Sequence, residues 1–328
     1  MEETKSNIPL NDLKNRISSN LKDINERSRN YIKDVITLIH KEIGINMILS
    51  IMLFGSQRSE KKQERSLISD CDLLFIFKNR VSNRHIREIE KYLIALEVKH
   101  KFKLPNPSLL HNILGVIQYS TGMFVSHFLT KQKFWEQANF HKIFHVNKVF
   151  SALFAPRNIV LSNVIDNCTI LYGEDLRNNI KPRIKISIKE MFKSTVMNLF
   201  ISFFALIIFP LKKINSIKYQ LEAIKWTLRT ANYYCFEDTE TLIYIINRFI
   251  SLESYASQIK SKQFFNKFLQ LRKNPHNIFN FMLRSPIRII KIHVKAIIYK
   301  KLVKKNLIKV PIRHRDQMIP GRTFPIQF

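Results

Sequence analysis

Residues 52–77, M-L-F-G-S-Q-R-S-E-K-K-Q-E-R-S-L-I-S-D-C-D-L-L-F-I-F, decide the fold of the first half of this chain. One apolar run ends at Gly55 and Ser56, a polar and charged stretch follows, and a second apolar run opens on Asp70 and Asp72. Apolar runs of this length are typical of strands that are buried on both faces of a sheet. The stretch therefore predicts two buried strands joined by a polar segment.

The two aspartates carry the chemistry of this stretch. Side chains alternate along a strand, so Asp70 and Asp72 point the same way while Cys71 points to the other face. Neighbouring carboxylates repel unless a cation neutralises them, and their oxygens suit Mg²⁺, whose shell a triphosphate completes. Gly55 lets the backbone approach a phosphate, and Ser56 adds a hydroxyl donor where a helix start offers free N–H groups. Together these residues predict one pocket for a metal ion and a phosphate.

The same stretch resembles the signature of the nucleotidyltransferase superfamily, which includes minimal nucleotidyltransferases, aminoglycoside nucleotidyltransferases and tRNA-end-adding enzymes. The matching residues are Gly55, Ser56, Ser69, Asp70 and Asp72. The resemblance implies transfer of a nucleoside monophosphate from an NTP to a hydroxyl acceptor, which would be RNA, protein or a small molecule. It implies that Asp70 and Asp72 are catalytic and bind Mg²⁺, and that Gly55 and Ser56 bind the nucleotide.

The sequence departs from this superfamily in one respect that concerns catalysis. Active members generally bring a third carboxylate from a later strand, but no acidic residue lies between Glu97 and Glu136. The third strand that we expect, residues 123–129, offers Ser126 and His127 instead. A catalytically inactive nucleotidyltransferase fold that binds nucleotide or RNA therefore stays open as the alternative to an enzyme.

The second half of the chain predicts a helical domain. Glycine is absent between Gly173 and Gly321, and apolar residues recur at helical spacing over long segments. We expect helices over about 187–211, 214–235, 239–257, 262–272 and 284–308. The predicted organisation is an α/β nucleotidyltransferase-like domain with a short mixed sheet (1–180), an all-α domain (181–310) and an extended basic tail (311–328).

The apolar segment 195–211 has to be weighed as a membrane span, which needs about 20 apolar residues. Asn198 and Ser202 lie within the segment, and Pro210 interrupts it just before Lys212. We expect a buried core helix here and keep a membrane-embedded or interfacial helix as the alternative.

The chain is strongly basic, with 54 Lys and Arg against 25 Asp and Glu and a formal net charge of +29. Such an excess favours polyanions such as RNA, DNA, nucleotide phosphates or an anionic membrane. The region from Phe281 to Phe328 holds twelve Lys or Arg and one acidic residue, Asp316. We expect this region to bind RNA or another polyanion, with a membrane surface as a less favoured partner.

Two further features indicate the cellular compartment. The cysteines Cys71, Cys168 and Cys235 show no C-x-x-C spacing, which argues against a disulfide framework or a structural zinc site. The first twenty residues are polar and charged and show no secretory signal. We therefore expect a cytoplasmic protein.

Overall fold

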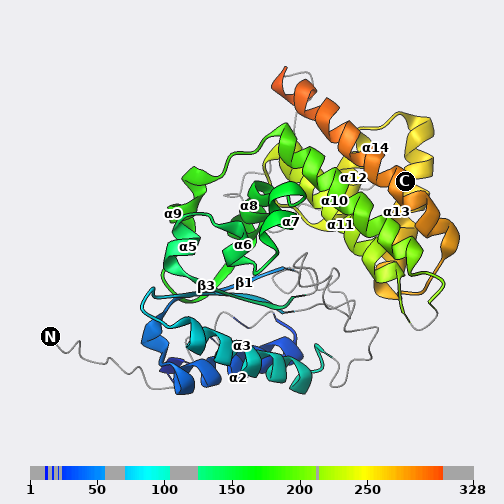
Figure 1. Ribbon diagram of the computed structural model, residues 1–328. Helices are drawn as coiled ribbons and strands as arrows, with labels where there is room; N and C mark the ends of the chain where they lie inside the picture. Colours follow the sequence, from blue (N-terminus) through cyan, green and yellow to red (C-terminus); the bar gives the residue numbers. More distant parts are fainter. Residues whose placement is uncertain are drawn as a thin grey trace, which may run out of the picture.

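The computed structural model describes residues 24–55, 71–103, 125–211 and 214–305, together with the single positions 12, 13, 17 and 21. In this part of the chain, a layered α/β unit is followed by a bundle of long helices (Figure 1). The predicted fold class, an α/β domain with a short mixed sheet followed by an all-α domain, is confirmed. The predicted basic tail, 311–328, lies outside the described residues.

The α/β unit is built on one sheet with the strand order β3-β2-β1-β4. The strands are β1 (Ile48–Phe54), β2 (Asp72–Phe77), β3 (His127–Lys131) and β4 (Thr169–Gly173). Strand β1 pairs antiparallel with both β2 and β4, whereas β2 pairs parallel with β3. The end of β1 and the starts of β2, β3 and β4 therefore meet at one edge of the sheet.

Two long helices cover one face of this sheet (Figure 1). They are α2 (Glu26–Glu42), which is followed by the short η1 (Ile45–Met47), and α3 (Asn83–Lys99). Both begin at a side-chain cap: the Asn25 carboxamide accepts from a backbone N–H at 2.8 Å, and the Ser82 hydroxyl does so at 3.1 Å. Their apolar sides bury Cys71 and every second residue of β2 in a shared core.

Short helices cover the opposite face (Figure 1). They are α5 (Gln132–Glu136), α6 (Phe140–Ile143), α7 (Lys148–Leu153), α8 (Arg157–Asn167), α9 (Arg177–Ile180) and η4 (Lys181–Arg183). Trp135 is fully buried in this second core, and its indole N–H donates to the Leu176 carbonyl at 2.9 Å. The bond holds α5 against the segment that follows β4. Helices therefore cover both faces of the sheet.

The helical domain contains the five helices that the periodicity predicts. They are α10 (Ile188–Ile207), α11 (Ile217–Phe236), α12 (Leu242–Ser251), α13 (Tyr255–Lys273) and α14 (Phe279–Lys304). Helices α10, α11 and α14 pack against one another and share one apolar core. Helix α14 starts before the predicted position and runs through Pro286.

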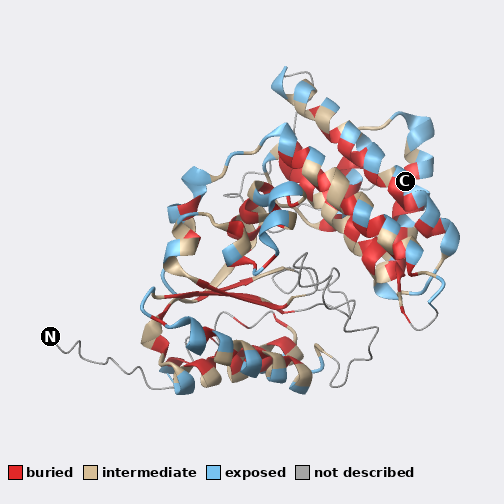
Figure 2. Ribbon diagram, in the orientation of Figure 1, coloured by how far each residue is buried: buried red, intermediate tan, exposed pale blue. Residues whose placement is uncertain are grey.

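Among the described helices, α10 is the one that is long and apolar enough to cross a membrane by length and composition, with a window of mean hydropathy 1.4. Only 39% of that window is buried in the structure. The expectation of a buried core helix therefore holds for one side of α10 only, the side that packs on α11 and α14. The other side exposes large apolar residues such as Phe192 and Phe203. Figure 2 shows buried, intermediate and exposed residues along this helix.

Candidate functional site

The end of β1 and the start of β2 form the centre of the candidate site. Phe54 pairs with Asp72 across the two strands, and Gly55 follows with a φ of 78°. A Cβ at Gly55 would overlap the Asp72 Oδ2 atom and lie 2.9 Å from Asp72 Cγ. The Asp72 carboxylate therefore lies directly against the Gly55 Cα. Both the positive φ and this contact require glycine at position 55.

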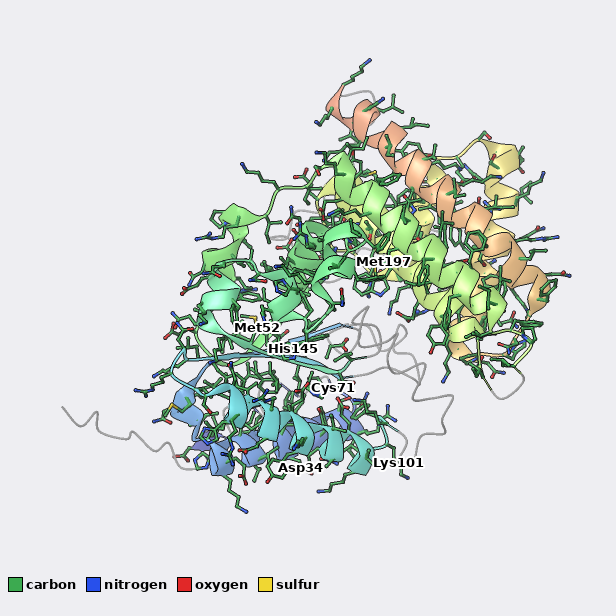
Figure 3. All side chains as sticks on the ribbon, in the orientation of Figure 1. Asp34, Met52, Cys71, Lys101, His145 and Met197 are labelled. Atoms are coloured by element: carbon green, nitrogen blue, oxygen red, sulfur yellow. The ribbon has the colours of Figure 1, made fainter. Side chains whose placement is uncertain are left out.

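Of the four predicted site residues, the structure describes Gly55 and Asp72 and brings them together. Ser56 and Asp70 lie outside the described residues. Asp72 is half-buried at the edge of the sheet. Cys71, just before it, is fully buried in the core between the sheet and α3 (Figure 3).

A buried carboxylate from α3 lies at the same edge of the sheet. Glu97 Oε1 is 2.6 Å from His127 Nδ1, and its Oε2 is 2.6 Å from Lys103 Nζ. Burial alone would raise the pKa of Glu97, but the hydrogen bond with His127 and the Lys103 ammonium hold that pKa below its ordinary value. Glu97 is therefore ionised at neutral pH inside the core. Because an ionised carboxylate only accepts, we assign a proton to His127 Nδ1.

Tyr31 of α2 lies next to this ion pair. Its side chain is fully buried, and its hydroxyl has no hydrogen-bond partner among the described residues. Burial, and then the nearby Glu97, Cys71 and Asp72, raise the pKa of Tyr31 well above its ordinary value. The Tyr31 phenol therefore stays neutral. The negative charge near the first residues of β2 and β3 is carried by the carboxylates.

His127 does not stand in for the missing third carboxylate. Strand β3 starts at His127, later than the expected 123–129, and His127 pairs with Leu73 in parallel register. Paired residues share a face of the sheet, so His127 lies with Leu73 on the α2 and α3 side, where it binds Glu97. In the described ranges, no three His, Cys, Asp or Glu side chains gather as a metal-binding group.

Glu97 was not among the predicted site residues, although its position in the sequence carries a signal. The buried residues of α3 are Ile86, Ile89, Leu93 and Glu97, which follow one another at helical spacing. Glu97 thus continues the apolar stripe of its helix. A carboxylate on an apolar stripe is expected to have a cationic or hydrogen-bonding partner, and here Lys103 provides the charge and His127 the hydrogen bond.

Comparisons with known proteins do not identify a function for this site. No protein family and no curated protein matches the sequence. One solved structure that superposes on the chain is the crystal structure of spectinomycin adenyltransferase AAD(9) from Enterococcus faecialis with ATP and spectinomycin. The TM-score is 0.47 at 9% identity, over 81% of this chain and 98% of that chain. A superposition of this quality carries no weight for function.

Proposed function

We propose that this protein transfers a nucleoside monophosphate from an NTP to a hydroxyl acceptor and releases pyrophosphate. The observation that carries the proposal is the contact between the Asp72 carboxylate and the Gly55 Cα. This contact places a carboxylate, which can bind a metal ion, next to a glycine, which lets a phosphate approach the backbone. A site for a metal-bound phosphate needs both features. The resemblance of residues 52–77 to the nucleotidyltransferase signature supports the same reading.

The residues have separate roles in this proposal. Asp72 and Asp70 hold Mg²⁺ through hard carboxylate oxygens, which are the ligands that this ion prefers. Gly55 and Ser56 hold the triphosphate through backbone N–H groups and a hydroxyl. When bound, Mg²⁺ neutralises charge on the phosphates. The described part of the site is compatible with such an ion, since Asp72 is only half-buried and Gly55 adds no side chain of its own beside the carboxylate.

Binding and turnover are tested separately. Calorimetry with ATP and Mg²⁺ should show binding that is lost with EDTA and in the Asp70→Asn, Asp72→Asn double variant. The matched control is Glu88→Gln, which removes one carboxylate from the outer side of α3, where Glu88 pairs with Arg84. It should bind ATP as the wild type does. Equal affinity in all variants and with EDTA would show that the net positive charge, and not this site, binds the nucleotide.

Turnover is measured with α-labelled ATP and three acceptor pools: cellular RNA, cellular protein and small hydroxyl compounds. Label transfer and pyrophosphate release should both vanish in Asp72→Asn and persist in Glu88→Gln. The acceptor pool that gains the label identifies the substrate class.

A second candidate is an inactive nucleotidyltransferase fold that binds nucleotide or RNA. The observation that favours it is the start of β3, where His127 faces α2 and α3 and is already paired with Glu97. Among the described residues, which do not include Asp70, no three His, Cys, Asp or Glu side chains form a metal-binding group. Magnesium-dependent ATP binding by the wild type without transfer to any acceptor pool would select this candidate.

A further inference from the structure

Helix α10 presents a stripe of large apolar side chains to solvent. The exposed members are Ile188, Phe192, Phe200, Phe203 and Ile207, spaced along one side of the helix. Phe192 is 71% exposed and Ile207 is 74% exposed. The opposite side of the helix already packs on α11 and α14, so the stripe is not part of the bundle core.

Helix α14 repeats this pattern beside α10 (Figure 1). Its exposed apolar residues are Phe279, Leu283, Ile287, Ile290, Val294 and Ile298. They recur every three or four residues over almost the whole helix, on the side opposite its buried residues. We call the two stripes together the α10–α14 face. Soluble monomers rarely expose this many large apolar side chains on two neighbouring helices unless they bind something.

The charge along this face is of one sign. Arg284 and Lys291 are exposed and lie three and four residues from Ile287, so they flank the stripe of α14. Helix α14 contains no Asp or Glu. The single acidic residue of α10, Glu190, is buried and accepts the Asn158 backbone N–H at 2.8 Å. Neither helix therefore offers an exposed carboxylate.

We propose that the α10–α14 face docks on an anionic lipid surface, with its Phe and Ile side chains at the acyl boundary and its basic residues among the headgroups. The charge pattern selects this occupant. A second copy of the chain would bring two cationic rims together, which costs free energy. RNA would match the positive charge of this face, but contacts with its phosphates would not remove the exposed apolar side chains from water.

Flotation of the full chain with lipid vesicles tests the proposal. The wild type should float with vesicles that contain about 30% phosphatidylserine and should not float with phosphatidylcholine alone. The triple variant Phe192→Gln, Phe203→Gln, Ile207→Gln should lower the partition coefficient about tenfold or more, because it removes three inserted side chains. Arg284→Gln with Lys291→Gln should lower it about fivefold or more.

Matched controls remove the same kinds of group elsewhere. Tyr92→Gln, Val149→Gln, Leu153→Gln replaces three exposed apolar residues of α3 and α7, and Lys260→Gln, Lys262→Gln removes two exposed charges of α13. The apolar control should partition as the wild type does, and the α13 charge control should keep most of the binding. A triple α10 variant that floats like the wild type would overturn the proposal. The proposal would also be overturned if light scattering shows the wild type to be a dimer and the triple α10 variant to be a monomer.

A single substitution covers the case in which the triple variant does not fold. Phe203→Trp places a reporter on the face, against a constant background from the buried Trp135 and the half-buried Trp226. Vesicles with brominated acyl chains should quench the added fluorescence. Tyr92→Trp, on α3, is the control and should not be quenched. An unquenched Phe203→Trp in bound protein would show that another surface meets the lipid.

Discussion

His293 of α14 is hydrogen-bonded to Ser194 of α10 inside the helical domain. His293 Nε2 lies 3.0 Å from the Ser194 hydroxyl, and Nδ1 lies 2.9 Å from the Ile289 carbonyl. The carbonyl only accepts, so Nδ1 carries the proton and Nε2 accepts from Ser194. Ser194 in turn accepts from the Asn198 side chain at 3.0 Å. A neutral imidazole therefore joins the two helices that form the α10–α14 face.

The stability of the helical domain should depend on pH through His293. Burial lowers its pKa from 6.5 to about 4, so the unfolded state binds this proton at a higher pH than the folded state does. The contribution is complete above pH 6.5 and is lost as the pH falls toward 4. The full loss is about 3 kcal/mol in the free energy of unfolding. Urea unfolding between pH 7 and 4 measures it, and His293→Gln should flatten the slope. An unchanged slope would assign the pH dependence to other groups.

Gly55→Ala should damage both stability and nucleotide binding. The positive φ and the overlap with Asp72 together should cost about 1–3 kcal/mol in the free energy of unfolding. Adding Asp72→Ala should recover the part due to overlap and leave the part due to φ. Gly44→Ala is the matched control, since its φ is 84° and its nearest neighbour is the Asn46 side chain. It should lower stability and leave ATP affinity unchanged. Equal loss of ATP affinity in both variants would contradict the assignment of Gly55.

Glu97→Gln should be among the most destabilising substitutions in the α/β domain. It leaves the Lys103 ammonium without its buried counter-charge and His127 Nδ1 without its ionised acceptor, which should cost about 3 kcal/mol or more. His127→Gln in the Glu97→Gln background should add little further loss, because the pair acts as a unit. The measurement is urea unfolding at neutral pH. The exposed pair of Arg84 and Glu88 provides the control, and Glu88→Gln should cost less than about 1 kcal/mol.

The low pKa of Glu97 also predicts acid sensitivity of the same domain. Its folded-state pKa lies below the ordinary value of 4.5, so the contribution of its charge is complete above that pH and is lost as the pH falls below it. Wild-type stability should therefore fall more steeply below pH 4.5 than that of Glu97→Gln. Parallel curves for the two proteins would contradict this prediction.

Continuous apolar runs made the central strands and the helical domain predictable. Strands β1 and β2 lie in the two apolar runs, and α10, α11 and α14 lie close to their expected ranges. The boundary between α12 and α13 was predicted too late, because the expected helix 239–257 includes the first residues of α13. Strand β4 was not predicted, because it is short and only Leu171 is fully buried. Its residues therefore lack the uniform apolar pattern that marks β1 and β2. The proximity of Gly55 to Asp72 was expected from the order of the motif, since the signature places both beside one pocket.

Other features depend on tertiary contacts that a pattern does not contain. The start of β3 is fixed by pairing with Leu73 and by the contact of His127 with Glu97, which comes from a distant helix. The exposure of one apolar side of α10 could also not be predicted from the sequence. Hydropathy measures how apolar a helix is, but it does not say which of its apolar sides the neighbouring helices cover.

The position of β4 in the sheet has a consequence for synthesis of the chain. Strand β1 lies between β2 and β4, and a Cβ at Gly173 would overlap the Leu49 carbonyl oxygen, so the two strands meet closely. Residues 48–54 leave the ribosome long before residues 169–173. In the meantime one edge of β1 displays unpaired N–H and C=O groups, which can recruit a strand from another chain. The nascent protein therefore carries an open sheet edge while more than a hundred further residues are made.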